Sequence, residues 1–467
     1  MELYDIVVIG AGSGGITSAV TAVGFGKKVL LIDKNKPGGE CTWSGCVPSK
    51  ALIHEAAKIH NARSFIKDFA YDSKEAMDHV HNVRETIYSH ENPEALSKLG
   101  IEYLQGEASF KDSHTIMVGE REIRGKKIII STGSSPFVPP IEGLDSVPYL
   151  TNESIFELER LPENLIILGG GPIGIELAQA VSRLGSKVHV VEMMETLIFR
   201  EEAEFSKAIA ELLTEEGVSL HLGARATRVT TRGEKVVLAY EKEGRESLVE
   251  ADTLLIAIGR KANTEGLGLV NAGIQYGKKG IQINAKLQTS QSHIYAIGDV
   301  VGPYQFSHMA NVQGILATQN AILPLKRKIK YNNIAWVTFT SPEIARAGMT
   351  EAEARESRSD NIRVYEYDFN QLDRAMTGGE TREKMKVILD RRGRVLGLSV
   401  MAHRAGEMIG EAQLLRSQNL NFSRMASVIH PYPTYSEVFT KIGKRVMVDN
   451  LLNHPLVKIF RKKNPNE

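Results

Sequence analysis

The chain has 467 residues, of which 42% are hydrophobic and 24% charged, and its formal net charge is +1. A chain of this length is too long for one hydrophobic core, so we expect about three domains. The balanced charge gives no global attraction to nucleic acid or to an acidic membrane. No apolar run approaches the roughly 20 residues that span a bilayer, and the opening MELYDIVVIGAG leaves no room for a signal peptide. We therefore expect a cytoplasmic protein with no membrane span.

The beginning of the chain predicts a dinucleotide-binding motif. The strand-like run YDIVVI leads into Gly10, Gly12 and Gly15, a small-residue helix follows, and a second strand ends at Asp33. Glycines at these positions allow a tight turn and let backbone N–H groups approach a pyrophosphate, while the acid binds ribose hydroxyls. The complete strand, turn, helix, strand and acid pattern indicates a bound dinucleotide, which the glycines alone would not.

Cys41 and Cys46, in CTWSGCVPSK, are the only two cysteines of the chain. A structural disulfide over so short a loop would stabilise little and is typical of small secreted domains. A zinc site needs about four ligands, and the nearest histidine, His54, lies too deep in the following helix-like run, so we expect no metal. Redox chemistry is the favoured interpretation, because a cysteine pair in a reducing compartment is more often catalytic than structural.

The dinucleotide motif then repeats. The segment NLIILGGGPIGIELAQAVSRLGSKVHVVE carries Gly169, Gly171 and Gly174, and its second strand ends at Glu192. In both motifs the acid follows the first glycine by 23 residues, so we expect two dinucleotides. A carboxylate at Glu192 favours a free ribose 2′-OH, and thus NADH over NADPH. Nearby Arg200 could favour the 2′-phosphate instead, and Glu192 could also be an ordinary solvated strand end.

Together these motifs resemble the class I flavoprotein disulfide reductases, the family of dihydrolipoamide dehydrogenase, glutathione reductase and mercuric reductase. GGECTWSGCVPSK resembles the redox-active segment, STGSSP at 131–136 the crossing between domains, and IAIGRKANTEGLGL at 256–269 the exit from the NAD domain. IYAIGDV at 294–300 resembles the second FAD motif, and FTSPEIARAGMTEAEA opens what resembles the interface domain. The resemblance implies FAD and NAD as cofactors and a homodimer with shared active sites.

The resemblance also implies individual roles. Cys46, at the start of a helix-like stretch whose N-terminus favours the thiolate, corresponds to the thiol facing the flavin, and Cys41 to the thiol that attacks the substrate. Lys50 and Glu176 correspond to the lysine near the flavin and its carboxylate partner beside the nicotinamide. Glu40 replaces a small hydroxyl residue, and we expect it to point away from the pyrophosphate or to bind backbone amides. Further implied cofactor contacts are Gly39, Lys50, Thr132, Gly133, Gly259, Arg260, Gly298 and Asp299.

The loop IHPYPTYSEV at 429–438 departs from the family pattern. Tyr432 stands where the lipoamide and glutathione enzymes have a proton-shuttling histidine, and His430 lies two residues upstream. Because an unperturbed tyrosine has a pKa near 10, it is a poor base at neutral pH. Three alternatives stay open: His430 acts as base with Glu437, Tyr432 donates a hydrogen bond or a proton, or the loop is only an interface segment.

We predict an α/β fold with two Rossmann-type dinucleotide-binding domains and a C-terminal α+β interface domain. The FAD domain is expected at 1–150 and 265–335, the NAD domain at 151–264 and the interface domain at 336–467. The expected enzyme passes electrons from NADH through FAD to the Cys41–Cys46 disulfide and on to a small disulfide or dithiol, with a lipoamide-like substrate favoured. Alternatives are direct transfer from the flavin to a quinone, mercuric reductase-like activity without the C-terminal cysteine pair of that enzyme, or a non-catalytic redox-responsive flavoprotein.

Overall fold

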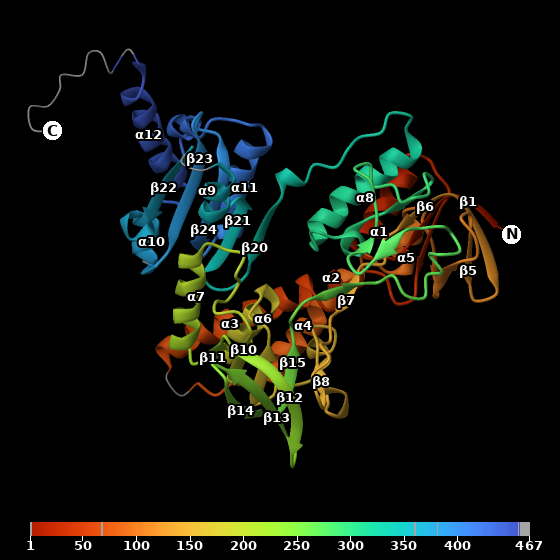
Figure 1. Cartoon of the computed structure of the whole chain (residues 1–467), viewed down its shortest axis with the longest axis horizontal. Helices are drawn as coiled ribbons and strands as arrows, with labels where there is room; N and C mark the ends of the chain where they lie inside the picture. The colour runs from red at the N-terminus through yellow and green to blue at the C-terminus, as the bar shows by residue number, and fades with distance from the viewer. Residues whose placement is uncertain (1, 67–68, 359–360, 381, 456, 458–467) are drawn as a thin grey trace, which may run out of the picture. The chain divides into compact units, whose positions relative to one another are not determined.

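A computed structural model describes residues 2–66, 69–358, 361–380, 382–455 and 457 (Figure 1). The chain divides into two compact units. Unit 1 comprises Met1–Glu195 and Glu216–Lys330, and unit 2 comprises Thr196–Glu215 and Tyr331–Glu467. Each unit is described by itself below.

The first sheet of unit 1 follows from the opening motif. Its strand order is β3-β2-β1-β6-β5-β4, with β19 paired to β6. Strands β1, β2, β3, β6 and β19 are parallel, whereas β4 and β5 are antiparallel additions. The strands are β1 Glu2–Ile9, β2 Val29–Asp33, β3 Glu102–Gln105, β4 Ala108–Phe110, β5 Thr115–Val118, β6 Arg121–Ile130 and β19 Ile294–Ala296. The run of buried residues in β1 and β2 is typical of parallel strands that are covered on both faces.

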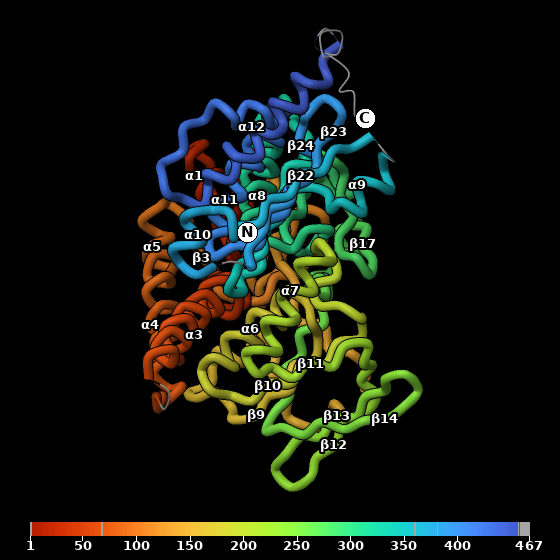
Figure 2. Tube along the Cα trace, turned by 90° about the vertical axis from the view of Figure 1, so that its left-hand side faces the viewer, coloured from red at the N-terminus to blue at the C-terminus, as the bar shows by residue number. Residues whose placement is uncertain are grey.

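Two helices, α1 (Ser13–Gly24) and α8 (Ser307–Ile322), lie together against this first sheet (Figure 1). Helix α1 buries small residues, among them Ala19 and Ala22, which allows the close packing. The helices α2 Gly39–Trp43, α3 Cys46–Phe65, α4 Ser73–Tyr88 and α5 Pro93–Lys98 follow β2, and α3 and α4 run side by side (Figure 2).

The second sheet of unit 1 is parallel, with the order β11-β10-β9-β15-β8. Its strands are β8 Tyr149–Leu150, β9 Asn164–Leu168, β10 Lys187–Glu192, β11 Ser219–Leu222 and β15 Thr253–Ile256, and helix α6 (Pro172–Arg183) connects β9 to β10. Strands β12 Arg225–Arg232, β13 Lys235–Lys242 and β14 Arg245–Ala251 form an antiparallel meander. Two short pairs complete the unit: β7 Ser134–Pro136 with β16 Arg260–Ala262, and β17 Tyr276–Gly277 with β18 Gly280–Ile281.

Unit 2 contains an antiparallel sheet with the order β20-β21-β24-β23-β22. Its strands are β20 Ala335–Thr338, β21 Glu343–Gly348, β22 Ile362–Asp368, β23 Lys384–Asp390 and β24 Val395–Ala402. Its helices are α7 Ala203–Glu215, α9 Glu351–Arg358, α10 Asp373–Gly378, α11 Ala405–Ser417 and α12 Glu437–Leu452. Side chains of β21, β23, β24, α11 and α12 form its hydrophobic core.

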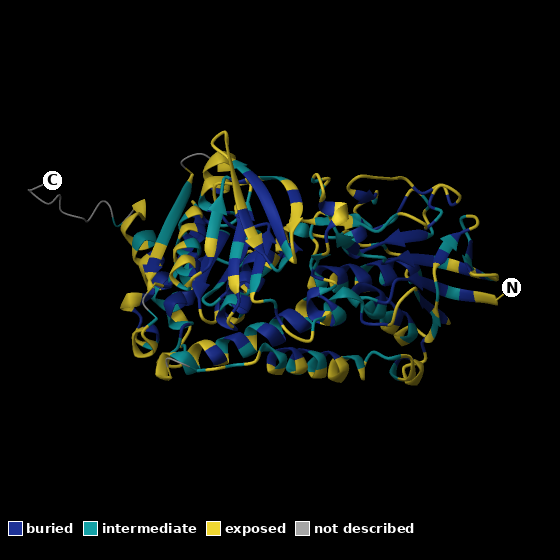
Figure 3. Ribbon diagram, turned by 90° about the horizontal axis from the view of Figure 1, so that it is seen from below, coloured by how far each residue is buried: buried dark blue, intermediate teal, exposed yellow. Residues whose placement is uncertain are grey.

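Short 3-10 turns complete the described elements: Leu144–Ser146, Ile155–Glu157, Gly298–Val301, Tyr331–Asn333, Phe369–Gln371 and Phe422–Ser427. The central strands are buried and the helices carry exposed outer faces (Figure 3). Among the described residues, no helix combines the length and the apolar character that a bilayer crossing requires.

The predicted fold class is confirmed, since both Rossmann-type sheets and a C-terminal α+β unit are present. The three domain boundaries stay a prediction. The division into two units places Thr196–Glu215, which lies inside the expected NAD domain, with the C-terminal residues.

Candidate active site

The turn after β1, here called the first glycine turn, consists of Gly10, Gly12 and Gly15. A Cβ on Gly10, whose φ is +103°, would lie 2.2 Å from the Ser131 carbonyl oxygen, and a Cβ on Gly15 would lie 1.8 Å from the Gly10 oxygen. Glycine is therefore required for α1 to start directly against β1. At Gly12, by contrast, the nearest atom to an added Cβ would be 3.8 Å away, on Gly39. The space beside the helix N-terminus is open, which fits a bound pyrophosphate.

Asp33, at the end of β2, is held by backbone donors. Its Oδ2 accepts a hydrogen bond from the Ala11 N–H at 2.6 Å, and its Oδ1 accepts one from the Asn35 N–H at 2.8 Å. Burial raises the pKa of this carboxyl group. The acid is thus fixed at the rim of the first glycine turn, where a ribose would lie.

The second glycine turn, Gly169, Gly171 and Gly174, repeats this construction. A Cβ on Gly174 would lie 2.0 Å from the Gly169 oxygen, whereas a Cβ on Gly171 would have no neighbour within 4 Å. Glu192 matches Asp33, because its Oε2 accepts from the Gly170 N–H at 2.6 Å and its Oε1 from the Met194 N–H at 2.7 Å. The chain therefore has two equivalent turns that fit two dinucleotides.

The cysteine pair lies at the start of a long helix. Cys41 is in α2, Cys46 is the first residue of α3, and both are free thiols in this structure. The Cys46 Sγ lies 3.6 Å from the hydroxyl oxygen of Ser307, which is itself the first residue of α8. Two helix N-termini therefore meet at Cys46, and both favour negative charge there.

The pKa values of the two thiols are shifted in opposite directions. A hydrogen bond from the Cys41 thiol lowers the pKa of Cys46 to about 6, assisted by the Ser307 hydroxyl and the positive charge of Lys50. The same hydrogen bond raises the pKa of Cys41 far above that of a free thiol. At neutral pH, Cys46 is therefore the thiolate and Cys41 retains its proton.

Lys50 and Glu176 form an ion pair. Lys50 Nζ lies 2.8 Å from Glu176 Oε2, and the Glu176 side chain is buried while that of Lys50 is 35% exposed. Lys50 lies one helical turn beyond Cys46 on α3, so both face the same side. The structure thus brings together the lysine, the carboxylate and the thiolate that the sequence singled out, and their catalytic roles stay predictions.

A buried polar network lies where the chain crosses between the two sheets of unit 1. Arg260 Nε donates to the Ser134 hydroxyl at 2.7 Å, and Ser134 in turn donates to Asp299 Oδ2 at 2.7 Å. Burial raises the pKa of Asp299. Among the described residues, Arg260 Nη1 is buried without a hydrogen-bond partner, and an unsatisfied donor of this kind fits a polar group of a bound cofactor.

The remaining predicted cofactor positions surround this network. Thr132 Oγ1 donates to the Asn263 carbonyl oxygen at 2.8 Å. Gly133 precedes β7 and Gly259 precedes β16, the two strands that pair here, and Gly298 begins the 3-10 turn that carries Asp299.

Glu40 has side-chain partners, and within the described residues it accepts no hydrogen bond from a backbone amide; the alternative, that it points away from a bound pyrophosphate, stays a prediction. It forms an ion pair with Arg260 and accepts a hydrogen bond from the Asn152 side chain at 2.9 Å. Burial raises the pKa of Glu40 to about 7. The negative charge of Glu40 is therefore compensated by the Arg260 guanidinium and not by backbone N–H groups as we had expected.

The loop at 429–438 lies in unit 2 and does not bring His430 and Glu437 together. His430 is half-buried, with Nε2 2.9 Å from Glu411 Oε2 and Nδ1 2.7 Å from the Thr440 hydroxyl. Glu437 instead pairs with Lys441 at 3.2 Å. His430 is thus held inside the unit by other partners.

Tyr432, in contrast, is 70% exposed. Its hydroxyl donates to Asp373 Oδ2 at 2.7 Å, and this hydrogen bond raises the pKa of Tyr432. Tyr432 is therefore an exposed phenol that donates a hydrogen bond, and its role in the reaction stays a prediction.

Three partners of the predicted site residues, two in unit 1 and one in unit 2, were not predicted from the sequence. Ser307 beside Cys46, Asn152 beside Glu40 and Asp373 beside Tyr432 are each remote from their partners along the chain.

Comparison with known proteins agrees with this geometry. A family model of the pyridine nucleotide-disulphide oxidoreductases matches residues 4–322, and the model of their dimerisation domain matches residues 334–442. A mercuric reductase of Bacillus cereus is 36% identical over 447 residues, which cover 93% of this chain and 70% of the relative. A dihydrolipoyl dehydrogenase of Thermus scotoductus is 33% identical over 453 residues, which cover 94% of this chain and 96% of the relative.

Among solved structures, the Cu(II) complex of the HOCl-induced flavoprotein disulfide reductase RclA from Escherichia coli superimposes with a TM-score of 0.87. The match has 31% sequence identity and covers 96% of this chain and 100% of the other.

Proposed function

The chain belongs to the pyridine nucleotide-disulphide oxidoreductases, and from that premise we propose that it uses NADH to reduce a small disulfide through Cys41 and Cys46. As a family member it is an FAD-dependent enzyme that uses a pyridine nucleotide. When bound, FAD supplies the two-electron chemistry that links oxidation of the nucleotide to reduction of the cysteine pair. The residues that would hold it are the first glycine turn, Asp33, Arg260 and Asp299.

The observation that carries this proposal is the state of the thiol pair. One thiolate and one protonated thiol share a hydrogen bond at the N-terminus of α3, beside the Lys50–Glu176 ion pair. A structural disulfide needs no such asymmetry. A dithiol that must both attack a substrate and close a new disulfide does.

The proposed exchange proceeds in two steps. Cys41 passes its proton to Cys46, attacks one sulfur of the substrate disulfide and releases the first product thiolate. Cys46 then loses that proton, attacks the Cys41 sulfur and releases the second thiolate, closing the Cys41–Cys46 disulfide. The substrate gains two electrons and the cysteine pair loses two. The two product thiols take up two protons, one that began on Cys41 and one from solvent.

Glu192 supports the preference for NADH. Both of its carboxylate oxygens are fixed by backbone N–H groups at the second glycine turn. A fixed carboxylate at this position binds a free ribose 2′-OH and repels a 2′-phosphate. We propose that NADPH is therefore the poorer donor.

A second acceptor class, soft metal ions, is favoured by the loop at 429–438. His430 is half-buried and contacts Glu411 and Thr440, and the exposed Tyr432 retains its proton, so neither of these two residues presents an exposed base. Reduction of a thiophilic cation requires thiolate ligands but no proton transfer to a leaving thiol. The mercuric reductases are relatives at 34–36% identity.

The oligomeric state and the cellular location of the protein are also proposals. The match to the family's dimerisation domain at 334–442 supports a homodimer. We propose shared active sites within that dimer. A cytoplasmic location, where a reduced cysteine pair would persist, stays a prediction.

Steady-state kinetics of the full-length holoenzyme test the proposal. NADH oxidation is measured with oxidised lipoamide, chelated Hg(II) or a quinone as acceptor, in the wild type and in Cys41→Ser and Cys46→Ser variants. Ser64→Ala, an exposed substitution near the other end of α3, is the matched control.

The proposal predicts lipoamide turnover that both cysteine variants lose and the control retains. Turnover of Hg(II) but not of lipoamide, also lost in both variants, would select the metal-ion alternative. Quinone turnover that survives in Cys46→Ser would contradict any role of the thiol pair in the main electron path.

A further inference from the structure

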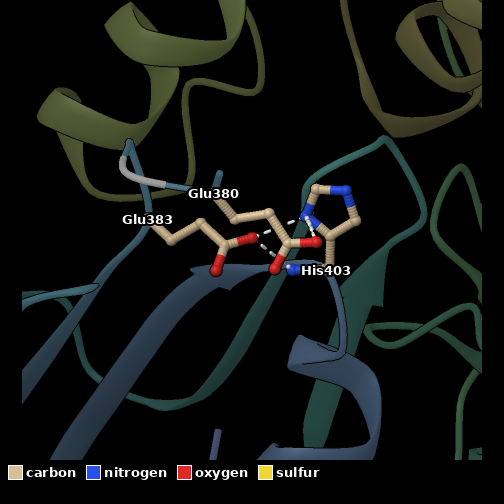
Figure 4. A group of neighbouring side chains, drawn as sticks. All are labelled: Glu380, Glu383 and His403. Atoms are coloured by element: carbon tan, nitrogen blue, oxygen red, sulfur yellow. Dashed lines mark hydrogen bonds and ion pairs between the residues drawn. The ribbon is translucent and has the colours of Figure 1, made fainter. Parts of the chain in front are cut away.

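Unit 2 contains a group of three potential metal ligands far from the cysteine pair in sequence. Glu380 lies between α10 and β23, Glu383 directly precedes β23, and His403 directly follows β24 (Figure 4). Their three ligand atoms lie within 4.8 Å of one another. Figure 4 shows the three side chains turned toward a common point.

The distances define how the group is held together. His403 Nδ1 lies 2.6 Å from Glu383 Oε1 and 3.6 Å from Glu380 Oε1. Ligand atoms that share one zinc ion, with bonds of about 2.0 to 2.2 Å, lie about 3 to 3.5 Å apart. A cation therefore fits among these atoms if it displaces the proton of the hydrogen bond between His403 Nδ1 and Glu383 Oε1 and the side chains adjust their spacing.

The surroundings of Glu383 are a second observation that favours a bound cation. Its side chain is 2% exposed, and within the described residues its Oε2 has no hydrogen-bond partner. Its Oε1 already accepts from the His403 backbone N–H at 2.8 Å as well as facing the imidazole. In the described part of the chain, neither Glu383 nor Glu380 forms an ion pair with a lysine or arginine. A buried carboxylate without such compensation is costly.

A pocket of about 320 Å³ opens beside the group. It gives a cation access and provides room for the water molecules that would complete its coordination. Its lining contains three carboxylates against two guanidinium groups, and buried Glu383 adds a fourth carboxylate, so the surroundings are net negative. The lining residues are Glu343, Arg374, Glu380, His403, Arg404, Glu407 and Tyr435.

We propose that Glu380, Glu383 and His403 bind one divalent transition-metal ion, with zinc as the reference ion. Imidazole nitrogen with carboxylate oxygen suits zinc and its neighbours, whereas calcium and magnesium prefer all-oxygen sites. Three protein ligands and an open position leave room for water or a further ligand from the pocket. The proposed site includes neither residue of the thiol pair and goes beyond the proposed function.

The glutamate spacing of three residues, with the histidine twenty residues further on, matches no common metal motif, so no local pattern indicates this group. The residues meet because β23 and β24 are antiparallel neighbours, with Lys384 opposite Met401.

Equilibrium dialysis of the full-length holoenzyme against Zn²⁺, with bound metal measured by mass spectrometry, tests the proposal. The measurement uses a Cys41→Ser/Cys46→Ser background, because thiolates would also bind zinc. Glu380→Gln and His403→Gln are the test variants. Glu356→Gln and His454→Gln, both exposed, are the matched controls.

The expected result is one Zn²⁺ per chain in the background and in both controls, with affinity reduced about tenfold or more in each test variant. Zinc should also raise the Tm of the background protein and not that of the test variants. If the test variants bind as tightly as the controls, or if the background binds no zinc, the group is only a hydrogen-bonded carboxylate–imidazole cluster and the proposal is overturned.

Discussion

At the scale of single residues, Cys46 is the centre of the proposed chemistry. Its lowered pKa arises first from the hydrogen bond of Cys41 and then from Ser307 and Lys50. Because a lowered thiol pKa means that the reactive thiolate exists above about pH 6, the alkylation of Cys46 by iodoacetamide should rise with pH to a midpoint near 6 in the reduced enzyme. Cys41→Ala should move the midpoint upward. A wild-type midpoint near that of a free thiol, measured by peptide mass spectrometry across a pH series, would contradict this assignment.

The Lys50–Glu176 ion pair gives a second residue-scale prediction. Lys50→Met removes a positive charge near Cys46 and, with it, the ammonium group that forms the ion pair with the buried Glu176 carboxylate. We expect kcat with NADH to fall about 10²-fold, with a smaller loss in Lys50→Arg because the charge is kept. Lys58→Met, an exposed lysine on the same helix, is the control. Equal turnover in Lys50→Met and Lys58→Met would remove the pair from the mechanism.

Glu192 sets the third prediction. In Glu192→Gln, one oxygen still accepts a backbone hydrogen bond, but the negative charge that faces the ribose is gone. The ratio of kcat/KM for NADH to that for NADPH should therefore fall about five- to tenfold. Glu234→Gln, at an exposed turn, should leave the ratio unchanged. A wild-type enzyme that prefers NADPH would show that the carboxylate does not select the coenzyme.

At the scale of elements, the glycine turns were the most predictable part of the chain. Strand, glycine turn, helix, strand and acid were all found where the sequence placed them, because short-range sterics fix each step: Gly174 must approach the Gly169 oxygen, and the acid must reach the adjacent backbone N–H groups. The helix that begins at Cys46 was equally predictable, because its signal also lies in the local sequence.

The pairings across the chain were less predictable. Glu40 finds Arg260, and His430 finds Glu411, only after elements distant in sequence pack together. The grouping of Thr196–Glu215 with the C-terminal unit has the same origin, because Glu201 contacts Trp336 at 2.7 Å and Arg346 at 3.2 Å. No local sequence pattern predicts contacts between residues that are so far apart in the chain.

The element scale also gives a stability prediction. In Gly174→Ala the new Cβ would lie 2.0 Å from a backbone oxygen, so we expect a loss of about 2 kcal/mol or more and a weaker affinity for NADH. Gly24→Ala, in α1 with no atom within 4 Å of the new Cβ, should be neutral or stabilising by about 0.5 kcal/mol. Thermal unfolding and NADH titration measure both. Similar Tm values for the two variants would contradict the close approach at Gly174.

At the scale of the whole molecule, unit 2 leaves large apolar side chains exposed. Ile429 is 97% and Leu414 61% exposed in the isolated chain, which is typical of a surface that a partner covers. With the dimerisation-domain match, this predicts a dimer of twice the chain mass of 51.5 kDa in sedimentation. Ile429→Asp should shift the equilibrium toward the monomer. A wild-type monomer at micromolar concentration would contradict shared active sites.

The central claim is that a pyridine nucleotide delivers electrons to Cys41 and Cys46, and thiol counting tests it most directly. The air-oxidised holoenzyme is alkylated under denaturing conditions before and after anaerobic addition of NADH, and its intact mass is measured. Because the chain has only two cysteines, the result is unambiguous. We predict no alkylated cysteine before NADH and two after it. Two alkylated cysteines in both samples, or none in both, would show that the pair lies outside the electron path.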